Sequence, residues 1–149
     1  MNFDPVDNVV QIHGFSDASK FVYAAVVYLR IVKDGKVFIS LLKAKTKVSP
    51  IKKILTIPKL ELMAVVLLSK LVNQIVDEIK LTNYTCHLWS DSKDVLYWLR
   101  EYPSKWTTFI ANQCSKIHDL VPKAQWRHVR SADNPADLTC LHWAFGTKS

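Results

Sequence analysis

Four carboxylates stand at positions from which they could act on one substrate group: Asp17, Glu61, Asp91 and Asp137. Two carboxylates about 4 Å apart repel each other by roughly 4 kcal/mol at an effective dielectric near 20. A divalent cation removes that repulsion, and ligand sets made only of oxygen select hard ions such as Mg²⁺ or Mn²⁺. A pair of such ions stabilises the attacking and leaving oxygens of a phosphodiester displacement. The set therefore predicts metal-assisted hydrolysis of a nucleic acid backbone, provided that the fold brings the four acids together.

A long amphipathic helix predicted over residues 58–79 must carry Glu61. Pro58 suits the first helical position, where its missing N–H needs no partner. The i, i+3/i+4 series that starts at Glu61 is otherwise apolar, with Ala64, Val65, Leu68, Val72, Ile75 and Ile79. An acid on the buried side of a helix destabilises the fold unless a partner compensates it, so Glu61 is the strongest of the four candidates.

Strands and helices alternate along the rest of the chain. Strands are predicted over residues 9–17, 21–33, 36–47, 84–91 and 125–130, and further helices over 93–101, 103–120 and from Asn134 onward. The Asp34-Gly35 pair predicts a tight hairpin between the second and third strands. The order βββαβααβα predicts an α/β fold, a five-stranded mixed sheet with helices on both faces.

The predicted topology places the remaining acids. If the first and fourth strands are parallel neighbours, Asp17 and Asp91 lie at the same end of the sheet, beyond its carboxyl edge. Asn134 suits the N-cap of the last helix and Pro135 its first position, which puts Asp137 near the third position. Each aspartate also has an ordinary interpretation: Asp17 as a turn residue, Asp91 as a cap, and Asp137 as a first-turn acid favoured by the helix dipole.

Size and composition predict a single domain over residues 1–149, since 49% of the 149 residues are hydrophobic. The longest apolar run, residues 62–68, is too short to span a membrane, and no signal peptide is visible. These features favour an intracellular protein that has no membrane partner. The three cysteines, Cys86, Cys114 and Cys140, form no C-x-x-C pair, which argues against a disulfide framework or a structural zinc site and favours buried thiols.

The charge of the chain favours a polyanionic partner such as nucleic acid. The formal net charge is +7, although a solvated, lysine-rich surface would account for it equally well. Lys43, Lys45 and Lys47 alternate with Ala44 and Thr46 along the predicted third strand. Because side chains alternate between the faces of a strand, three ammonium groups are expected on one face.

Six blocks of the sequence, in this order, resemble a known family. They read HGFSDAS, KTKVSP, IPKLELMAVVL, WSDSKDVLYWL, WTTFIAN and WRHV…NPADL. As an ordered set they are similar to the ribonuclease H domain of Bel/Pao long-terminal-repeat retrotransposon polyproteins, over roughly residues 12–138. The resemblance implies the ribonuclease H-like fold and cleavage of the RNA strand of RNA–DNA hybrids with two Mg²⁺ ions, for which Mn²⁺ could substitute.

The resemblance also implies an Asp-Glu-Asp-Asp ligand set, which falls on the four acids named above. Glu61 lies between Asp17 and Asp91, as in ribonucleases H, whereas the glutamate of retroviral-type integrases follows both aspartates. An adjoining reverse transcriptase domain in a polyprotein is an implied partner, besides the hybrid itself. Residues expected to contact the hybrid are Ser19, Lys43, Lys45, Lys47, Ser92 and Lys93.

The chain departs from the family pattern in three places. Residues 131–133 leave no room for the histidine loop that precedes the last acid in many ribonucleases H, and His128 falls instead in the predicted fifth strand, where a structural role is expected. The handle of some cellular enzymes is missing, since Glu101 leads almost directly to Trp106. After Asp137 the chain reads LTCLH where the family commonly has LASRG.

Several functions remain open at this point. The first is an active, hybrid-specific endoribonuclease. The second, from a different class, is a catalytically lapsed, retrotransposon-derived module that binds nucleic acid or protein, and the third is a nuclease acting on another duplex. The sequence also leaves open whether the chain is an excised polyprotein domain or a stand-alone descendant, and whether it resides in cytoplasmic virus-like particles or the nucleus.

Overall fold

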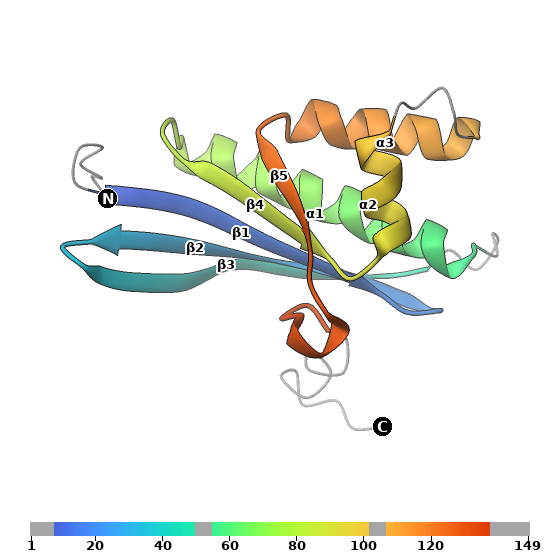
Figure 1. The fold of residues 1–149 in the computed structure, drawn as a ribbon, viewed down its shortest axis with the longest axis horizontal. Coiled ribbons are helices and arrows are strands. Elements are labelled where there is room, and N and C mark those ends of the chain that lie inside the picture. Colours follow the sequence, from blue (N-terminus) through green and yellow to red (C-terminus); the bar gives the residue numbers. More distant parts are fainter. Residues whose placement is uncertain (1–7, 50–54, 102–106, 138–149) are drawn as a thin grey trace.

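A computed structural model describes residues 8–49, 55–101 and 107–137 of the chain. Five strands form one sheet in the order β3-β2-β1-β4-β5 (Figure 1). These strands are β1 (Asn8–Ala18), β2 (Val22–Lys33), β3 (Lys36–Val48), β4 (Thr85–Ser90) and β5 (Ala124–His128). β1, β2 and β3 pair antiparallel, whereas β4 is parallel to both β1 and β5. The predicted α/β class and five-stranded mixed sheet are confirmed.

The hairpin between β2 and β3 forms where Asp34-Gly35 predicts it. Both residues have positive φ angles, 52° at Asp34 and 74° at Gly35, as the type I′ turn of a two-residue hairpin loop requires. Lys33 and Lys36 are register partners on either side of this turn.

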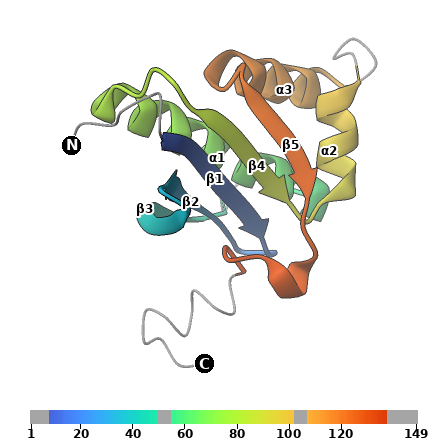
Figure 2. The ribbon, with the colours of Figure 1, turned by 60° about the vertical axis from the view of Figure 1, so that its left-hand side comes forward.

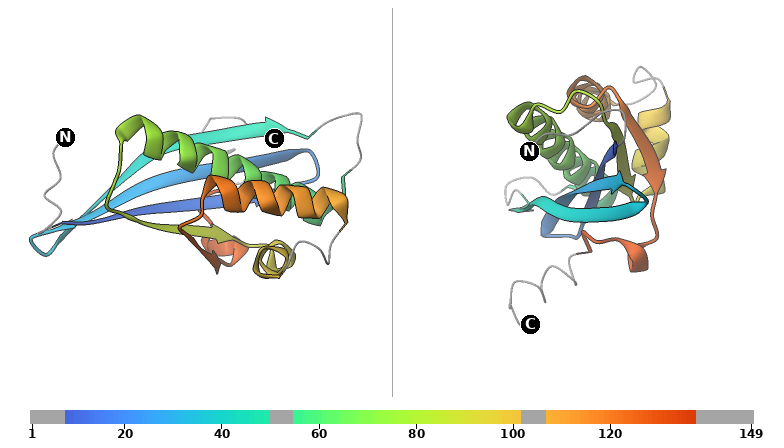
Figure 3. Two further views of the ribbon diagram at one scale, coloured as in Figure 1. Left: turned by 90° about the horizontal axis from the view of Figure 1, so that it is seen from above. Right: turned by 90° about the vertical axis from the view of Figure 1, so that its left-hand side faces the viewer.

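Three α-helices follow the hairpin: α1 (Ile57–Ile79), α2 (Lys93–Arg100) and α3 (Thr108–Leu120). α1 and α3 pack side by side on one face of the sheet (Figure 2), and the end-on view in Figure 3 shows both on the same side. A short 3₁₀ helix, η2 (Ser131–Asp133), lies toward the opposite face. The last helix expected from Asn134 onward, apart from its first residues, falls outside the described residues, as do Trp106 and Cys140.

The core lies between the sheet and α1. Gly14 of β1 leaves no space for a side chain, because a Cβ atom there would lie 2.7 Å from both Leu68 Cδ1 and Leu88 Cδ2. Leu68 and Leu88 are both fully buried, so they have little room to move aside. The small residue at position 14 therefore lets Leu68 of α1 and Leu88 of β4 pack against the β1 backbone, while α1 itself lies over β1 and β2.

The predicted apolar side of α1 is buried over most of its length. The exception is Ile79, which is 46% exposed, because the core contacts of the helix end at Val76. Thr56 caps the start of the helix by accepting a hydrogen bond from the Lys59 N–H. Cys86 and Cys114 are buried free thiols, as predicted. No helix within the described ranges is both long and apolar enough to cross a membrane.

Candidate functional site

Asp17 and Asp91 lie at the same end of the sheet. Ser16 of β1 and Ser90 of β4 are register partners in a parallel pair, and each aspartate directly follows one of these serines. Both serines are buried on the α1 side, and both aspartates are half-buried. The parallel pairing that the sequence predicted is thus what sets the two carboxylates at one edge.

Glu61 lies in the first two turns of α1 and reaches the junction of β4 and α2. The Ser92 hydroxyl donates to its carboxylate, and the same hydroxyl caps α2 by accepting from the Val95 N–H at 3.2 Å. Burial raises the pKa of Glu61 above its ordinary value, and the nearby carboxylates of Asp91 and Asp94 raise it further. The Ser92 hydrogen bond opposes these effects. Glu61 therefore sits in an acidic, half-buried position that disfavours its charge.

The segment after β5 is bonded to both aspartate-bearing strands. Ser131 Oγ donates to Asp91 Oδ2 at 3.0 Å, and Asn134 Nδ2 donates to the Ser16 carbonyl oxygen at 2.9 Å. Asn134 is 3% exposed, and its Oδ1 accepts from the Ala136 N–H at 2.9 Å. These bonds hold the turn that leads into Asp137 beside the residue that precedes Asp17.

The prediction of a helix from Asn134 through Asp137 is wrong for the residues that are described. Asn134 does cap the backbone as an N-cap residue would, but the next residues form a turn closed by the Asp137 N–H and the Asn134 carbonyl at 3.0 Å. The side chain that caps a helix can equally close a turn of its own, so the local pattern did not distinguish the two.

Two associations link the acids or the segments that carry them. Glu61 and Asp91 interact electrostatically, while the turn before Asp137 is bonded to the strand of Asp17. No group of three or more His, Cys, Asp or Glu side chains with metal-binding geometry occurs among the described residues. The candidate ligands nevertheless fit a hard divalent cation chemically, because all are carboxylates and Glu61 forms no ion pair with any described basic side chain.

A family model for the Pao retrotransposon-like RNaseH-like domain matches residues 3–92, more than half of the chain. The chain belongs to this family. The matched region of this Pao-type domain contains Asp17, Glu61 and Asp91 and ends before Asp137. None of the curated proteins compared with the chain matches it.

Solved structures with the ribonuclease H fold resemble the Pao-type domain. LC11-RNase H1, isolated from compost and solved in complex with an RNA/DNA hybrid, is 14% identical with a TM-score of 0.58, over 92% of this chain and 99% of that one. The N-terminal RNase H domain of a Mycobacterium tuberculosis protein, solved as a fusion with maltose-binding protein, is 15% identical with a TM-score of 0.58, over 91% and 99%. At these identities the likeness shows the fold, which is ribonuclease H-like.

A longer protein also contains this fold. The foamy viral protease-reverse transcriptase, solved with an RNA/DNA hybrid, is 9% identical with a TM-score of 0.56. The match covers 94% of the Pao-type domain but only 21% of the viral chain.

The residues expected to contact a hybrid lie in different surroundings. Ser19 and Lys93 are exposed, and the Ser19 hydroxyl bonds the Val22 backbone within its turn. Ser92 is 5% exposed. Its hydroxyl donates to Glu61 and accepts from the Val95 N–H of α2, so it faces the protein interior. As predicted, the three strand lysines share one face of β3. It is the α1 side, since their partners in β2 are the core residues Tyr23, Ala25 and Val27.

The opposite face of the sheet carries a row of stacked rings. The His13 ring stacks on His87 at 4.8 Å between centroids, and Phe15 stacks on Trp89 at 5.9 Å. Burial lowers the pKa of both histidines, and the Arg30 and Arg127 guanidinium groups lower each further, as His87 does for His13. Alternation along each strand places these rings on one face, and the parallel pairing of β1 with β4 brings them into stacking contact.

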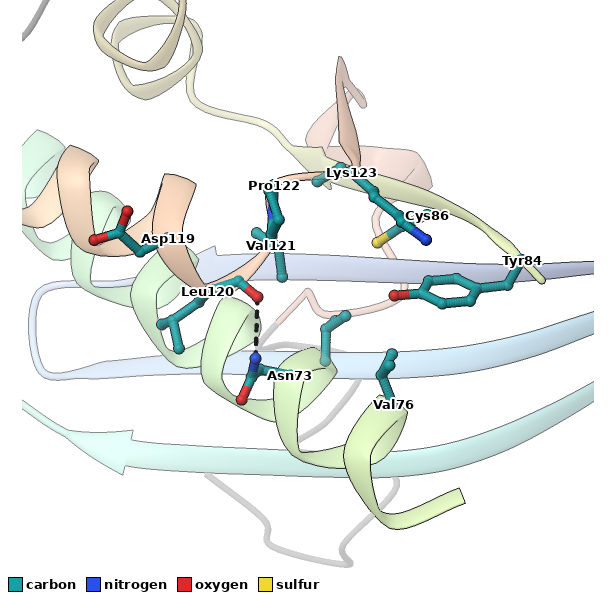
Figure 4. Close-up of a pocket in the computed structure, with 11 residues that line it drawn as sticks. Asn73, Val76, Tyr84, Cys86, Asp119, Leu120, Val121, Pro122 and Lys123 are labelled. Carbon is teal, nitrogen blue, oxygen red and sulfur yellow. Dashed lines mark hydrogen bonds between the residues drawn. The ribbon is translucent and has the colours of Figure 1, made fainter. Parts of the chain in front are cut away.

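One cavity lies away from the acids. It has a volume of about 280 Å³ and lies where β4 and β5 begin and α1 and α3 end, at the opposite end of the sheet from Asp17 and Asp91 (Figure 4). Asn73 closes one side by donating to the Leu120 carbonyl at 3.1 Å, and the Lys123 ammonium lies over the Tyr84 ring. Burial raises the pKa of the Cys86 thiol there to about 12, so it stays protonated and unreactive.

Two residues of the candidate site were missed from the sequence. Ser131 was counted only as part of a short loop, and Asn134 only as a helix cap. Their partners, Asp91 and Ser16, lie 40 and 118 positions away along the chain. One feature of the sequence could have indicated the role of Asn134. If this residue before Pro135 is buried, both its side-chain carbonyl oxygen and its NH₂ group need hydrogen-bond partners.

Proposed function

We propose that the Pao-type domain is a metal-dependent endoribonuclease that hydrolyses the RNA strand of RNA–DNA hybrids. The observation that carries the proposal is the position of Glu61, half-buried against Asp91 and Asp94 with no described basic side chain to compensate it. A carboxylate in such surroundings favours the binding of a cation. Family membership and the ribonuclease H-like fold support the same reaction.

The four acids would divide the task of holding two Mg²⁺ ions. Asp17, Glu61 and Asp91 would hold one ion, and Asp17 and Asp137 would complete the other. When bound, the two cations would stabilise the attacking and leaving oxygens of the phosphodiester displacement. The protein's own contribution is positioning: Ser92 orients Glu61, Ser131 orients Asp91, and Asn134 holds the turn that leads to Asp137.

Preference for a hybrid would come from duplex shape and contacts to 2′-hydroxyl groups rather than from base edges. The preference is tested by cleavage of end-labelled RNA–DNA hybrid, double-stranded RNA and double-stranded DNA of one sequence, in Mg²⁺ and separately in Mn²⁺. The proposal expects cuts in the RNA strand of the hybrid and intact strands in the other two duplexes. Equal cutting of double-stranded RNA would instead favour a nuclease with a broader duplex substrate.

In a polyprotein, this domain would act next to a reverse transcriptase domain. The retrotransposon family supports this context, as does the fold's occurrence within a viral protease-reverse transcriptase chain. Co-purification of the domain with the neighbouring polyprotein segment tests the contact.

A second function is favoured by a specific observation. Because no three described acids have metal-binding geometry, a catalytically lapsed module that binds nucleic acid or protein also agrees with the structure. Such a module would bind hybrid with strong salt dependence but would cut it in neither metal. The substrate panel therefore separates the two functions directly.

A further inference from the structure

Four lysines from three elements converge on the helix-covered side of the sheet. Lys45 and Lys47 of β3 point to the α1 side, because their register partners Ala25 and Tyr23 belong to the core beneath α1. Lys70 of α1 and Lys116 of α3 are both exposed, and Lys70 contacts Lys116 and interacts electrostatically with Lys45 and Lys47. Figure 3, seen from above, shows α1 lying between β3 and α3. We call Lys45, Lys47, Lys70 and Lys116 the lysine surface.

The lysine surface has no anionic partner in the part of the chain that the structure describes. None of its four ammonium groups forms an ion pair with a described carboxylate, and Asp119, one turn beyond Lys116, is not within ion-pair distance of it. The residues one turn beyond Lys70 are Asn73 and Gln74, which are neutral. Burial lowers the pKa of Lys70, and Lys116, Lys47 and Lys45 lower it further, which agrees with uncompensated positive charge.

The lysine surface begins at the end of the sheet that holds the acids. Lys47 pairs with Tyr23, and Tyr23 pairs with Ala18, the residue after Asp17. With strands about 4.8 Å apart, the Lys47 backbone lies about 10 Å across the sheet from Ala18. Lys70 is nine residues beyond Glu61, about 13.5 Å along the α1 axis. Lys47 thus lies near the end of the sheet that holds the acids, on the face opposite to the Asp17 side chain, whose partner in β2 is Ala24. A duplex bound at the acids would reach the lysine surface only by passing this end of the sheet.

We propose that the lysine surface binds the phosphodiester backbone of double-stranded nucleic acid beyond the cleavage site, an inference that rests on the proposed function for the choice of a duplex as ligand. Ammonium groups contact phosphates as point charges and carry no sequence information. None of the four lysines takes part in a described ring contact that could stack an unpaired base, as sites for single strands commonly provide. Contact with the backbone alone is the mode that remains.

The test is the salt dependence of binding by the full chain without divalent metal. Fluorescently labelled RNA–DNA hybrid and double-stranded DNA are titrated with wild type, Lys70→Gln/Lys116→Gln and Lys33→Gln/Lys36→Gln at several salt concentrations. The last variant removes the same charge at the exposed β2–β3 hairpin, at the other end of these strands. Far-UV circular dichroism and thermal melting check that all three proteins are folded.

We expect the lysine-surface variant to lower the slope of log Kobs against log[salt] by about two, one for each lost phosphate contact, equally for both duplexes. The hairpin variant should keep nearly the wild-type slope, and Lys70→Arg/Lys116→Arg should restore it. Equal slopes for the two glutamine variants would overturn the proposal, because net charge alone would then govern binding. Binding of polyglutamate in preference to either duplex would also overturn it and would indicate an acidic protein partner.

Failure of this inference differs from failure of the proposed function. The binding measurement needs neither metal nor turnover, so it also applies to Asp91→Asn, which removes an acid of the proposed cleavage site. If hybrid is not cleaved but the salt slope depends on Lys70 and Lys116, the lysine surface stands and the nuclease does not. If hybrid is cleaved with a slope that these lysines do not change, the nuclease stands and the lysine surface does not.

Discussion

Asn134 Nδ2 donates a hydrogen bond to the carbonyl oxygen of Ser16 over 2.9 Å, inside the protein. This bond joins the turn that leads to Asp137 to the strand residue directly before Asp17. Two acids 120 positions apart, as counted from residue 17 to residue 137, thereby enter the same neighbourhood. The arrangement of the candidate site depends on this amide as much as on the carboxylates.

Replacing the Asn134 amide should destabilise the fold. Asn134→Ala removes the bonds to Ser16 and to the Ala136 N–H and leaves buried backbone groups unpaired, so we expect a loss of about 1–3 kcal/mol in the free energy of unfolding. Urea denaturation monitored by tryptophan fluorescence measures it. Asn112→Ala, on the exposed side of α3, should change stability by less than about 0.5 kcal/mol. Similar values for both variants would show that the Ser16 bond contributes little.

Neutralising Glu61 should stabilise the protein near pH 7. Its pKa is raised in the folded state, so the proton is bound more tightly there than in the unfolded chain, and the ionised form present at neutral pH opposes folding. Glu61→Gln should therefore raise stability by a few tenths of a kcal/mol to about 1 kcal/mol, since solvent screens a half-exposed site. The gain should vanish as the pH falls below the ordinary glutamate pKa.

Thermal melting of wild type, Glu61→Gln and Glu78→Gln over a pH series checks this expectation. Glu78 is an exposed residue near the other end of α1 and serves as the matched control. A stabilisation that persists unchanged into acid, or that Glu78→Gln reproduces, would contradict the role assigned to burial and to Asp91.

The secondary structure was largely predictable from local signals, and the site only in part. Asp34-Gly35 specified its hairpin because two positive φ angles suit few other residue pairs, and the i, i+3/i+4 apolar series specified α1. Strand alternation correctly placed Lys43, Lys45 and Lys47 on one face. Each of these features is determined within a few residues.

What the sequence did not predict depends on contacts between distant segments. The Asn134 side chain donates to the Ser16 carbonyl, a partner that is close only once the sheet has formed. A turn closed by the Asp137 N–H therefore stands where the sequence predicts the start of a helix. Ile79 continues the apolar series, yet it is exposed because the core ends one turn earlier. The approach of Lys70 to Lys116 likewise follows from how α1 and α3 pack, which periodicity does not determine.

Magnesium should stabilise the wild-type protein through the acids. A ligand that binds only the folded state at 100 times its Kd adds about 2.7 kcal/mol to stability, so the melting temperature should rise with Mg²⁺ concentration. Asp17→Asn and Asp91→Asn should abolish the shift, whereas Asp119→Asn, beside the cavity at the far end of the sheet, should retain it. Loss of the shift in all three variants would point to non-specific binding of the cation.

Acid should weaken the ring-covered face of the sheet. The pKa values of His13 and His87 are lowered in the folded state, so the unfolded chain takes up protons first and stability falls as the pH drops through about 6.5. His87→Phe keeps a ring against His13 and removes one titrating group. The number of protons taken up on unfolding should therefore fall by up to one, and the stability of the variant should depend less on pH. Proton uptake on unfolding, from melts between neutral and mildly acidic pH, measures this.

The matched control for this expectation is His128→Phe, at an exposed position at the end of β5. It should leave the wild-type pH dependence in place. An unchanged slope in His87→Phe would mean that the stacked histidines do not govern the acid sensitivity of the fold.

Cleavage of an RNA–DNA hybrid labelled on its RNA strand shows directly whether the acids make this domain a nuclease. Wild type, Asp91→Asn and Asp119→Asn are compared in Mg²⁺ and in Mn²⁺. We expect wild type and Asp119→Asn to cut the RNA strand. Asp91→Asn should lose at least about two orders of magnitude in rate, because electrostatic stabilisation of the transition state is removed. Cleavage by Asp91→Asn at the wild-type rate, or an intact RNA strand with every protein, would contradict this expectation.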